Sequence, residues 1–276
     1  MNSLNFHTIP WSARIGMVMI VIMVFLGIAG PWIAPYTNAE LVGDVWEPMF
    51  GNFLLGTDNL GRDMLSRLLY GARITLFIAF VATLISFTMG AVLGFFAAVQ
   101  KGWLDQVLSR GNDTLMALPT LIFALVVLSV LPANLFTLIM VMAVLDSTRV
   151  YRIGRAIAVD IEALDFIEMA RLRGEKKSWI ILHEILPNAL TPLIAEFGLR
   201  FSFAILFLSS LSFLGLGVQP PAADWGALVK ENKDGIAFGI SASLVPATAI
   251  AILTISVNLV ADWLLSKTSD LKGGEG

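Results

Sequence analysis

Apolar runs recur along this chain, and most are close to the roughly 20 residues that a helix needs to cross the hydrocarbon core of a bilayer. Hydrophobic residues make up 57% of the chain and charged residues only 14%, well below the roughly 25% of an average soluble domain. We therefore expect an all-α membrane protein. The sequence predicts six spans, at residues 14–34, 74–99, 114–132, 134–148, 189–215 and 244–265.

The first apolar run is predicted to be a membrane anchor that the protein retains. Trp11 and Trp32 stand near its two ends, roughly 30 Å apart at 1.5 Å per residue, which suits the aromatic belts of both interfaces. A cleaved signal peptide is the alternative. Pro31 and Pro35 crowd the place where a small-residue cleavage site would lie, and this disfavours cleavage.

The distribution of basic residues predicts that both termini lie in the cytoplasm. With the N-terminus inside, the cytoplasmic segments hold twelve basic residues and the outer segments hold five, and such an excess marks cytoplasmic loops. The twelve are Arg14, Lys101, Arg110, Arg149, Arg152, Arg155, Arg171, Arg173, Lys176, Lys177, Lys267 and Lys272, and the five are Arg62, Arg67, Arg73, Lys230 and Lys233. The segment between the fourth and fifth spans is then cytoplasmic.

Residues 168–187, EMARLRGEKKSWIILHEILP, form most of that segment, and a short helix is predicted across its beginning. Asp165 and Glu168 have the D-x-x-E spacing of a capping box, so the helix should start near Phe166. It should end at Gly174, whose missing Cβ permits the left-handed conformation of a helix C-cap.

A second short helix is predicted to follow, with Ser178 as its N-cap and Pro187 as the residue that ends it. His183 and Glu184 within it begin the H-E-x-x-H pattern of zinc proteases, but position 187 holds proline instead of the second histidine. His7 lies far away in the N-terminal tail. An intramembrane hydrolase is therefore disfavoured, and no G-x-S-x-G motif supports one.

The first short helix is expected to have an apolar side and a charged side. Phe166, Met169 and Ala170 fall at helical spacing on one side, which leaves Glu168 and the arginines at 171 and 173 to face water or a partner. A surface hairpin without a partner is one interpretation. Docking on another protein is favoured, because a helix of about eight residues is not stable alone in water.

Three runs of the sequence, together with the charged segment, match a known pattern. The charged segment reads Glu168, Met169, Ala170, three residues, Gly174 and then Leu186-Pro187, which reproduces E-A-A-x3-G-x9-I-x-L-P with Met169 for the first Ala and Glu184 for the usual apolar residue. Residues 56–73 follow the pattern GTDxxGRDxxSRxxYGxR. Residues 211–221 read LSFLGLGVQPP and are followed by Trp225-Gly226, and residues 258–262 are similar to the pattern NLxGD. From about residue 54 to 265, the chain resembles the C-type permease subunit of the dipeptide, oligopeptide, opine and nickel importers of the ABC class.

This resemblance implies a type I importer permease fold with six transmembrane helices and cytoplasmic coupling helices, in a bacterial inner membrane. It also implies several partners: a homologous second permease in a heterodimer, two cytoplasmic ATPases, an extracytoplasmic solute-binding protein and membrane lipid. The E-A-A loop of such permeases is the coupling helix that docks in a groove of one ATPase. The expected coupling residues here are Glu168, Met169, Ala170, Arg171, Arg173, Gly174 and Pro187.

The chain is not expected to hydrolyse ATP or to bind a cofactor itself. Residues 174–178, GEKKS, lack the second glycine of a P-loop, so the partner ATPases would use the ATP and magnesium. No cysteine is present, which excludes disulfides and cysteine-ligated metals. The net charge of −3 predicts no nucleic-acid partner.

Polar residues within the spans are candidates for the translocation path, because charges in lipid are costly. Glu196 and Arg200 stand four residues apart on one helical face, so they either neutralise each other within the bundle or line the path of a peptide-like solute. A secondary transporter or channel that needs no ATP remains the competing class. It predicts two inverted halves, and we find no internal repeat.

The expected organisation has three parts. Residues 1–72 form the anchor helix and an extracytoplasmic loop, residues 73–266 form the permease domain with its coupling loop at about 150–187, and residues 267–276 form a cytoplasmic tail. The glycines at 56 and 61 indicate a turn-rich outer loop, and the resemblance implies that this loop helps to shape the entrance where a solute-binding protein docks. Substrate identity is open, since relatives carry peptides, opines, nickel complexes, glutathione or oligosaccharides and select them largely through the separate binding protein.

Overall fold

The computed structural model describes residues 9–273 of the chain, with side chains described as far as Ser266. This part is a bundle of helices. They are α1 (Trp11–Ile33), α2 (Met64–Gln100), α3 (Gly102–Met116), α4 (Thr120–Val130), α5 (Leu135–Glu162), α6 (Asp165–Leu172), α7 (Lys177–Trp179), the π-helix η2 (Ile180–Ile185), α8 (Leu186–Phe213), α9 (Trp225–Asn232), the 3-10 helix η3 (Lys233–Phe238) and α10 (Leu244–Gly273).

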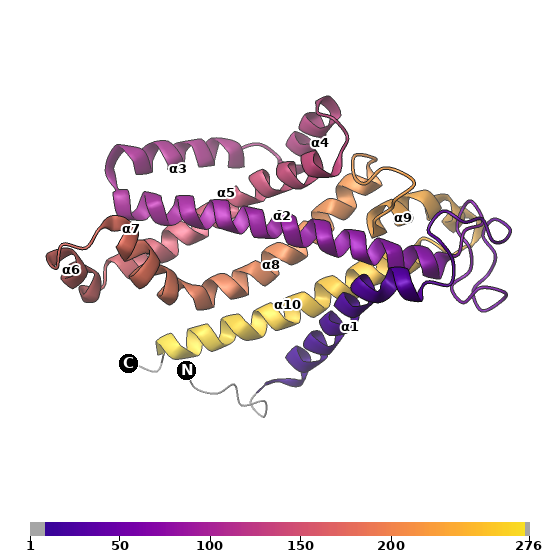
Figure 1. Cartoon of the computed structure of the whole chain (residues 1–276), viewed down its shortest axis with the longest axis horizontal. Coiled ribbons are helices and arrows are strands. Elements are labelled where there is room, and N and C mark those ends of the chain that lie inside the picture. Colours follow the sequence, from indigo (N-terminus) through magenta and orange to yellow (C-terminus); the bar gives the residue numbers. More distant parts are fainter. Residues whose placement is uncertain (1–8, 274–276) are drawn as a thin grey trace.

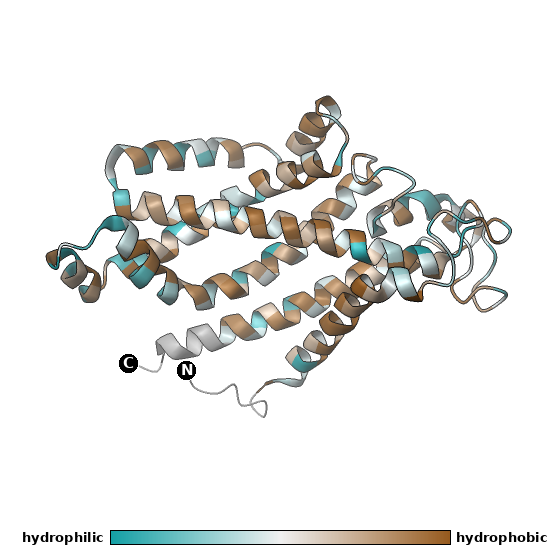
Figure 2. Ribbon diagram, viewed as in Figure 1, coloured by the Kyte–Doolittle hydropathy of each residue, from teal (hydrophilic) through white to brown (hydrophobic). Residues whose placement is uncertain are grey.

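The long helices run along one axis of the molecule, as Figure 1 shows. The short helices α6 and α7 lie at one end, toward which α10 also runs, whereas α9 and the loop of residues 34–63 lie at the opposite end. Figure 2 shows hydrophilic residues gathered at these two ends and hydrophobic residues along the middle of the long helices. An apolar middle between two polar ends is the pattern of a bundle that crosses a bilayer.

Four helices of the described part are long and apolar enough to cross a membrane: α1, α2, the run Lys177–Phe213 and Leu244–Ser266 of α10. The helices α3 and α4 make a fifth candidate only if they form one span with a bend of 87°. The helix α5 has 28 residues, and its length would allow a crossing, but its first two thirds already carry Asp146, Arg149 and Arg152. Charged residues lower its mean hydropathy, so composition alone does not identify α5 as a span.

The predicted limits of the third and fourth spans were wrong. The range 114–132 contains a break, because Pro119 lacks the N–H that a continuous helix needs and its ring restricts the residue before it. The range 134–148 is only the first half of α5, which continues to Glu162. Arg149, which was counted as a loop residue, therefore lies on a helix.

The helices α2 and α5 cross with their backbones in contact. A Cβ built on Gly90 would lie 2.7 Å from the carbonyl oxygen of Ser147, and one on Gly94 would lie 2.7 Å from that of Tyr151. Glycines spaced four apart on one helix face allow this close approach, which is a common way of packing helices in membranes. The α2–α5 crossing is thus fixed at backbone level.

We expect Gly90→Ile to destabilise the fold by about 3 kcal/mol or more, because its side chain would have to displace the backbone of α5. The thermal unfolding midpoint of the detergent-solubilised protein measures this loss. Gly111→Ala in α3 is the matched control, since a Cβ at Gly111 meets nothing within 4 Å. That control should be neutral or slightly stabilising, and equal midpoints for both variants would contradict the packing described above.

Ion pairs between largely buried side chains stabilise the end of the bundle opposite α6. Asp58 has no exposed surface, and its Oδ2 lies 2.6 Å from Arg62 Nε and 2.6 Å from Arg67 Nη1. Burial raises the pKa of Asp58, but hydrogen bonds from the Arg62 and Leu60 amides and the charges of both arginines outweigh it, so the pKa lies below its usual value. Both arginines also pair with Glu231 of α9. The residues 56–67 therefore tie the start of α2 to α9.

Candidate functional site

The helix α6 lies outside the apolar band, at the end of the bundle shown in Figure 1. It spans Asp165–Leu172, within one residue of the predicted start. The predicted capping box is absent, because the N-cap is Leu164, whose side chain carries no oxygen, and Asp165 is already the first helical residue. Asp165 and Glu168 still lie in the first turn, where negative charge interacts favourably with the helix dipole.

Gly174 ends this helix as the sequence predicts. Its φ is +81°, in the left-handed region, and its N–H donates to the carbonyl of Arg171 at 2.9 Å. The N–H of Glu175 donates to the carbonyl of Ala170 at 3.2 Å, which completes a Schellman motif. The chain therefore turns sharply away from the axis of α6 at this glycine.

The side of α6 that faces the bundle is made by Ile167 and Ala170, both with no exposed surface. They belong to a cluster with Ile180 and Ile185 of η2, which also includes the adjoining ends of α2 and α5. The sequence predicts that Phe166, Met169 and Ala170 share one apolar side of the helix. In the structure only Ala170 of these three is buried, whereas Phe166 and Met169 are exposed.

An exposed apolar stripe covers the opposite side of α6. Its members are Phe166 at 38% exposed, Met169 at 56% and Leu172 at 76%. Their spacing of three residues places them along one face of the helix. Sequence reasoning missed Leu172, although this spacing from Met169 was visible. We refer to Phe166, Met169 and Leu172 as the α6 stripe.

Ion pairs connect α6 to the end of α5 and to the junction between α2 and α3. The side chain of Glu162, at the end of α5, is only 3% exposed and pairs with Arg171 of α6. The other carboxylate oxygen, Oε2, lies 3.0 Å from Nζ of Lys101, the residue between α2 and α3. Glu162 was not among the predicted site residues, since nothing in the local sequence indicates that these three residues meet.

Glu184, one of the two departures from the E-A-A pattern, lies close to Arg173. An Nη2 of Arg173 lies 3.7 Å from Oε1 of Glu184, and the guanidinium stands 5.9 Å from the centre of the Trp179 ring. The ring of Trp179 in turn stacks on His183 at 4.8 Å. Glu184 thus has a partner within the segment. Glu168 is exposed on α6.

The prediction that Pro187 ends a second helix was wrong. The one-turn helix α7 begins after Lys176, without a Ser178 cap, and leads through η2 into α8 without a break. In η2 the backbone hydrogen bonds join residues five apart, as in the bond that the Leu186 N–H donates to the carbonyl of Ile181. Pro187 lies in the first turn of α8, where a missing N–H is tolerated. The segment is therefore continuous with a membrane helix.

Glu196 and Arg200 lie within α8 and pair with each other, with Arg200 Nε 2.8 Å from Glu196 Oε1. Arg200 Nη1 also lies 3.6 Å from Oδ1 of Asp146 in α5. Asp146 accepts a hydrogen bond from Ser86 of α2 and lies 3.9 Å from Arg149. The predicted pair is thus part of a four-charge group with two acids and two bases, which links α2, α5 and α8. Within the described residues, no group of three acidic, histidine or cysteine side chains is placed to hold a metal ion.

These features define an α-helical protein that crosses a membrane several times and presents a short amphipathic helix at one polar end. Comparison with known proteins defines it further. Residues 90–268 match the family model described as binding-protein-dependent transport system inner membrane component. Residues 11–45 match the N-terminal TM domain of oligopeptide transport permease C.

Relatives cover most of the chain. A Brucella suis protein, named provisionally as a peptide transport system permease, is 37% identical over 254 residues, which are 92% of this chain and 86% of the relative. The di/tripeptide transport system permease protein DppC of Pseudomonas aeruginosa is 34% identical over 256 residues, covering 90% and 84%. The glutathione transport system permease protein GsiD of Escherichia coli is 33% identical over 255 residues, covering 91% and 84%. The chain belongs to the family of inner-membrane permease components of binding-protein-dependent ABC transport systems.

Proposed function

We propose that this chain is the transmembrane subunit of an ATP-driven importer and forms half of the translocation path for peptides or similar small solutes. The observation that carries this proposal is the α6 stripe, an apolar surface on a helix outside the apolar band. Such a surface costs free energy in water, so it is expected to be covered by a soluble partner. Because the chain belongs to a family of ABC permeases, we infer that this partner is one of two cytoplasmic ATPases, which would bind and hydrolyse ATP with magnesium.

The proposed coupling mechanism relies on the two sides of α6. The α6 stripe binds in a groove of the ATPase, while Ile167 and Ala170 hold the helix against η2 and therefore against α8. Because η2 and α8 are continuous, a displacement of α6 on ATP binding tilts α8 as a rigid body. The pairs of Glu162 with Arg171 and Lys101 carry the same displacement to α5 and to the junction of α2 and α3.

Six spans are part of the same proposal. The helices α1, α2, the α3–α4 pair, α5, α8 and α10 would each cross the bilayer, with both termini on the cytoplasmic side together with α6. The charges of α5 support this assignment, since Asp146 and Arg149 are paired in the bundle and do not face lipid alone. A homologous second permease would complete a heterodimer, and a solute-binding protein would dock at the α9 end.

The four-charge group is proposed to face the translocation path. Asp146, Arg149, Glu196 and Arg200 combine both signs, which suits the two charged ends of a peptide. Two relatives are named as permeases for di/tripeptides and for glutathione, and both solutes carry an amine and carboxylates. The same group also stabilises the bundle by mutual neutralisation, so its members are expected to tolerate replacement poorly.

Gly174→Val is expected to abolish uptake while the protein still inserts in the membrane. A β-branched residue that adopts the left-handed conformation costs roughly 1–2 kcal/mol of conformational energy. The chain is therefore expected to leave α6 in a different direction, which would move the α6 stripe away from its binding position. Gly174→Asn is the control, since asparagine tolerates this conformation. Normal uptake by the valine variant would contradict the coupling role of the segment.

Reconstitution distinguishes the importer from a secondary transporter. The tagged chain should purify from mild detergent with a second permease and two ATPases, and uptake into vesicles should require all of them and ATP. If the chain purifies alone and transports when reconstituted alone, the importer proposal is wrong.

A further inference from the structure

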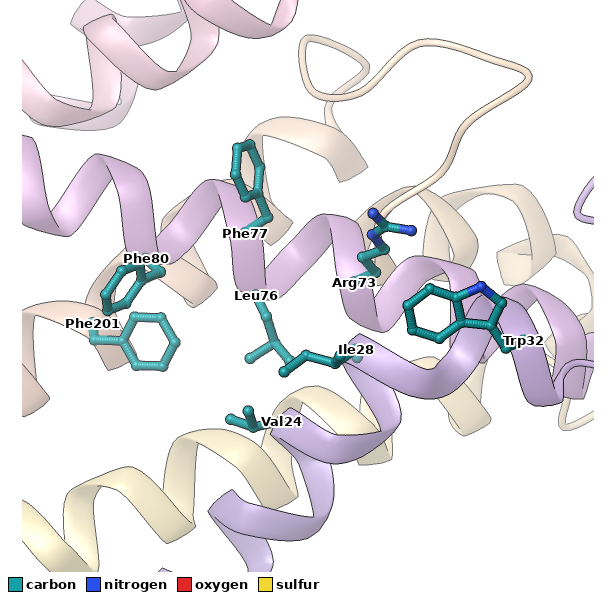
Figure 3. Close-up of a pocket in the computed structure, with 9 residues that line it drawn as sticks. Val24, Ile28, Trp32, Arg73, Leu76, Phe77, Phe80 and Phe201 are labelled. Atoms are coloured by element: carbon teal, nitrogen blue, oxygen red, sulfur yellow. The ribbon is translucent and has the colours of Figure 1, made fainter.

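A groove between α1 and α2 has no role in the proposed function. It has a volume of about 510 Å³, and Figure 3 shows the residues of α1, α2 and α8 that line it. Its apolar walls are formed by Val24, Ile28, Leu76, Phe77, Phe80 and Phe201. The helices α1 and α2 are both candidate membrane spans. The molecule that occupies the groove therefore comes from the bilayer or is part of another membrane protein.

One end of the groove is polar. Among the residues that line it, Arg73 alone carries a charge, and Figure 3 shows Arg73 and Trp32 together at one end, with Phe80 and Phe201 at the other. Within the part of the chain that the structure describes, no carboxylate lies within 4 Å of the Arg73 guanidinium. The groove therefore combines a long apolar wall with one uncompensated positive charge.

The positions of these residues match the layers of a bilayer. Arg73 stands just before the apolar run of α2, and Trp32 stands near the end of α1, as expected for residues at the headgroup level. Phe80 is seven residues further along α2, which is about 10 Å at 1.5 Å per residue. A molecule with an anionic head at Arg73 can thus extend an apolar chain along the groove.

We propose that this groove binds one anionic phospholipid from the leaflet at the α9 end, with its phosphate on Arg73 and an acyl chain along Leu76, Phe77 and Phe80. A guanidinium forms paired, charge-assisted hydrogen bonds with phosphate oxygens. A zwitterionic lipid binds less well, because its own ammonium competes for the phosphate. An apolar helix of a second protein fits less well too, because it would leave the charge of Arg73 uncompensated in the membrane.

Fluorescence quenching by brominated lipids tests this site in the full-length protein, together with any subunits that purify with it. The fluorescence of Trp32 is obtained by subtracting the emission of the Trp32→Phe variant from that of the natural protein. Brominated phosphatidylglycerol should quench it with about tenfold higher apparent affinity than brominated phosphatidylcholine, because the ammonium of phosphatidylcholine weakens the contact between its phosphate and Arg73. Arg73→Gln should remove the preference, and Arg73→Lys should keep part of it.

Two outcomes would overturn the proposal. Equal quenching by both lipids would mean that ordinary bulk lipid fills the groove. Absence of quenching by either lipid, with cross-linking of Ile28→Cys to a second polypeptide, would mean that another protein covers it. The chain contains no cysteine of its own, so that introduced thiol reports on the groove alone.

Discussion

Leu172→Asp is expected to release the ATPase subunits from the purified complex, while the chain itself still folds and inserts. Leu172 is the most exposed member of the α6 stripe and makes no part of the buried cluster. A charge placed within an apolar contact typically costs about 2 kcal/mol or more, which corresponds to a loss of about 30-fold in affinity. Co-purification of the ATPases, followed by titration of the isolated ATPase onto the permease in detergent, measures this loss.

Leu41→Asp is the matched control for this effect. Leu41 is similarly exposed, at 68% against 76% for Leu172, but it lies in the loop at the opposite end of the bundle. It should leave ATPase binding unchanged. If the two variants bind the ATPase equally well, the α6 stripe is not the docking surface.

Glu162→Gln is expected to separate ATP hydrolysis from uptake. The variant keeps the shape of the side chain but removes the charge that holds Arg171 and Lys101, so the link from α6 to α5 and to the α2–α3 junction is weakened. Both cations are partly exposed and can be solvated, so the link is worth about 1–2 kcal/mol and not the full value of a buried pair. We expect uptake to fall about tenfold, with hydrolysis largely retained.

The ratio of solute transported to ATP hydrolysed in vesicles is the informative measurement, because a purely structural defect would lower both rates together. Asp160→Asn serves as the control, since Asp160 is exposed and only two residues away on α5. An unchanged ratio in Glu162→Gln would remove Glu162 from the coupling path.

Local backbone chemistry made part of this segment predictable from sequence. Gly174 was identified because only a residue without a Cβ adopts its conformation freely, and the start of α6 was placed within one residue. The prediction of a capping box was wrong because the helix starts at Asp165, one residue before the predicted start at Phe166. Pro187 was misread because a proline interrupts an α-helix but is accepted in the first turn after a π-helix, which no short sequence pattern reveals.

Contacts between distant residues were the part that sequence reasoning could not supply. The burial of Ile167 and the exposure of Met169 depend on where η2 passes. The contacts of Glu162 with Arg171 and Lys101 depend on how α2, α5 and α6 pack. The pair Glu196 and Arg200 was predictable from its spacing of four, whereas the addition of Asp146 required the α5–α8 contact.

The two departures from the E-A-A pattern have different structural settings. Glu184 pairs with Arg173 on the surface of the segment, an interaction worth at most about 1 kcal/mol because both groups are partly exposed. Met169 lies in the α6 stripe, where an unbranched thioether can adapt to an irregular groove. Met169 is therefore expected to affect the fit to the ATPase, and Glu184 the internal order of the segment.

Site-specific cross-linking tests the central proposal most directly. Because the chain has no cysteine, Leu172→Cys provides a single thiol on the α6 stripe, to which a short thiol-to-amine cross-linker can be attached in native membranes. We predict a product that joins this chain to an ATPase subunit and whose yield changes when ATP is added. If the thiol is labelled by small reagents but no ATPase product forms with or without ATP, α6 is not the element that couples this permease to ATP hydrolysis.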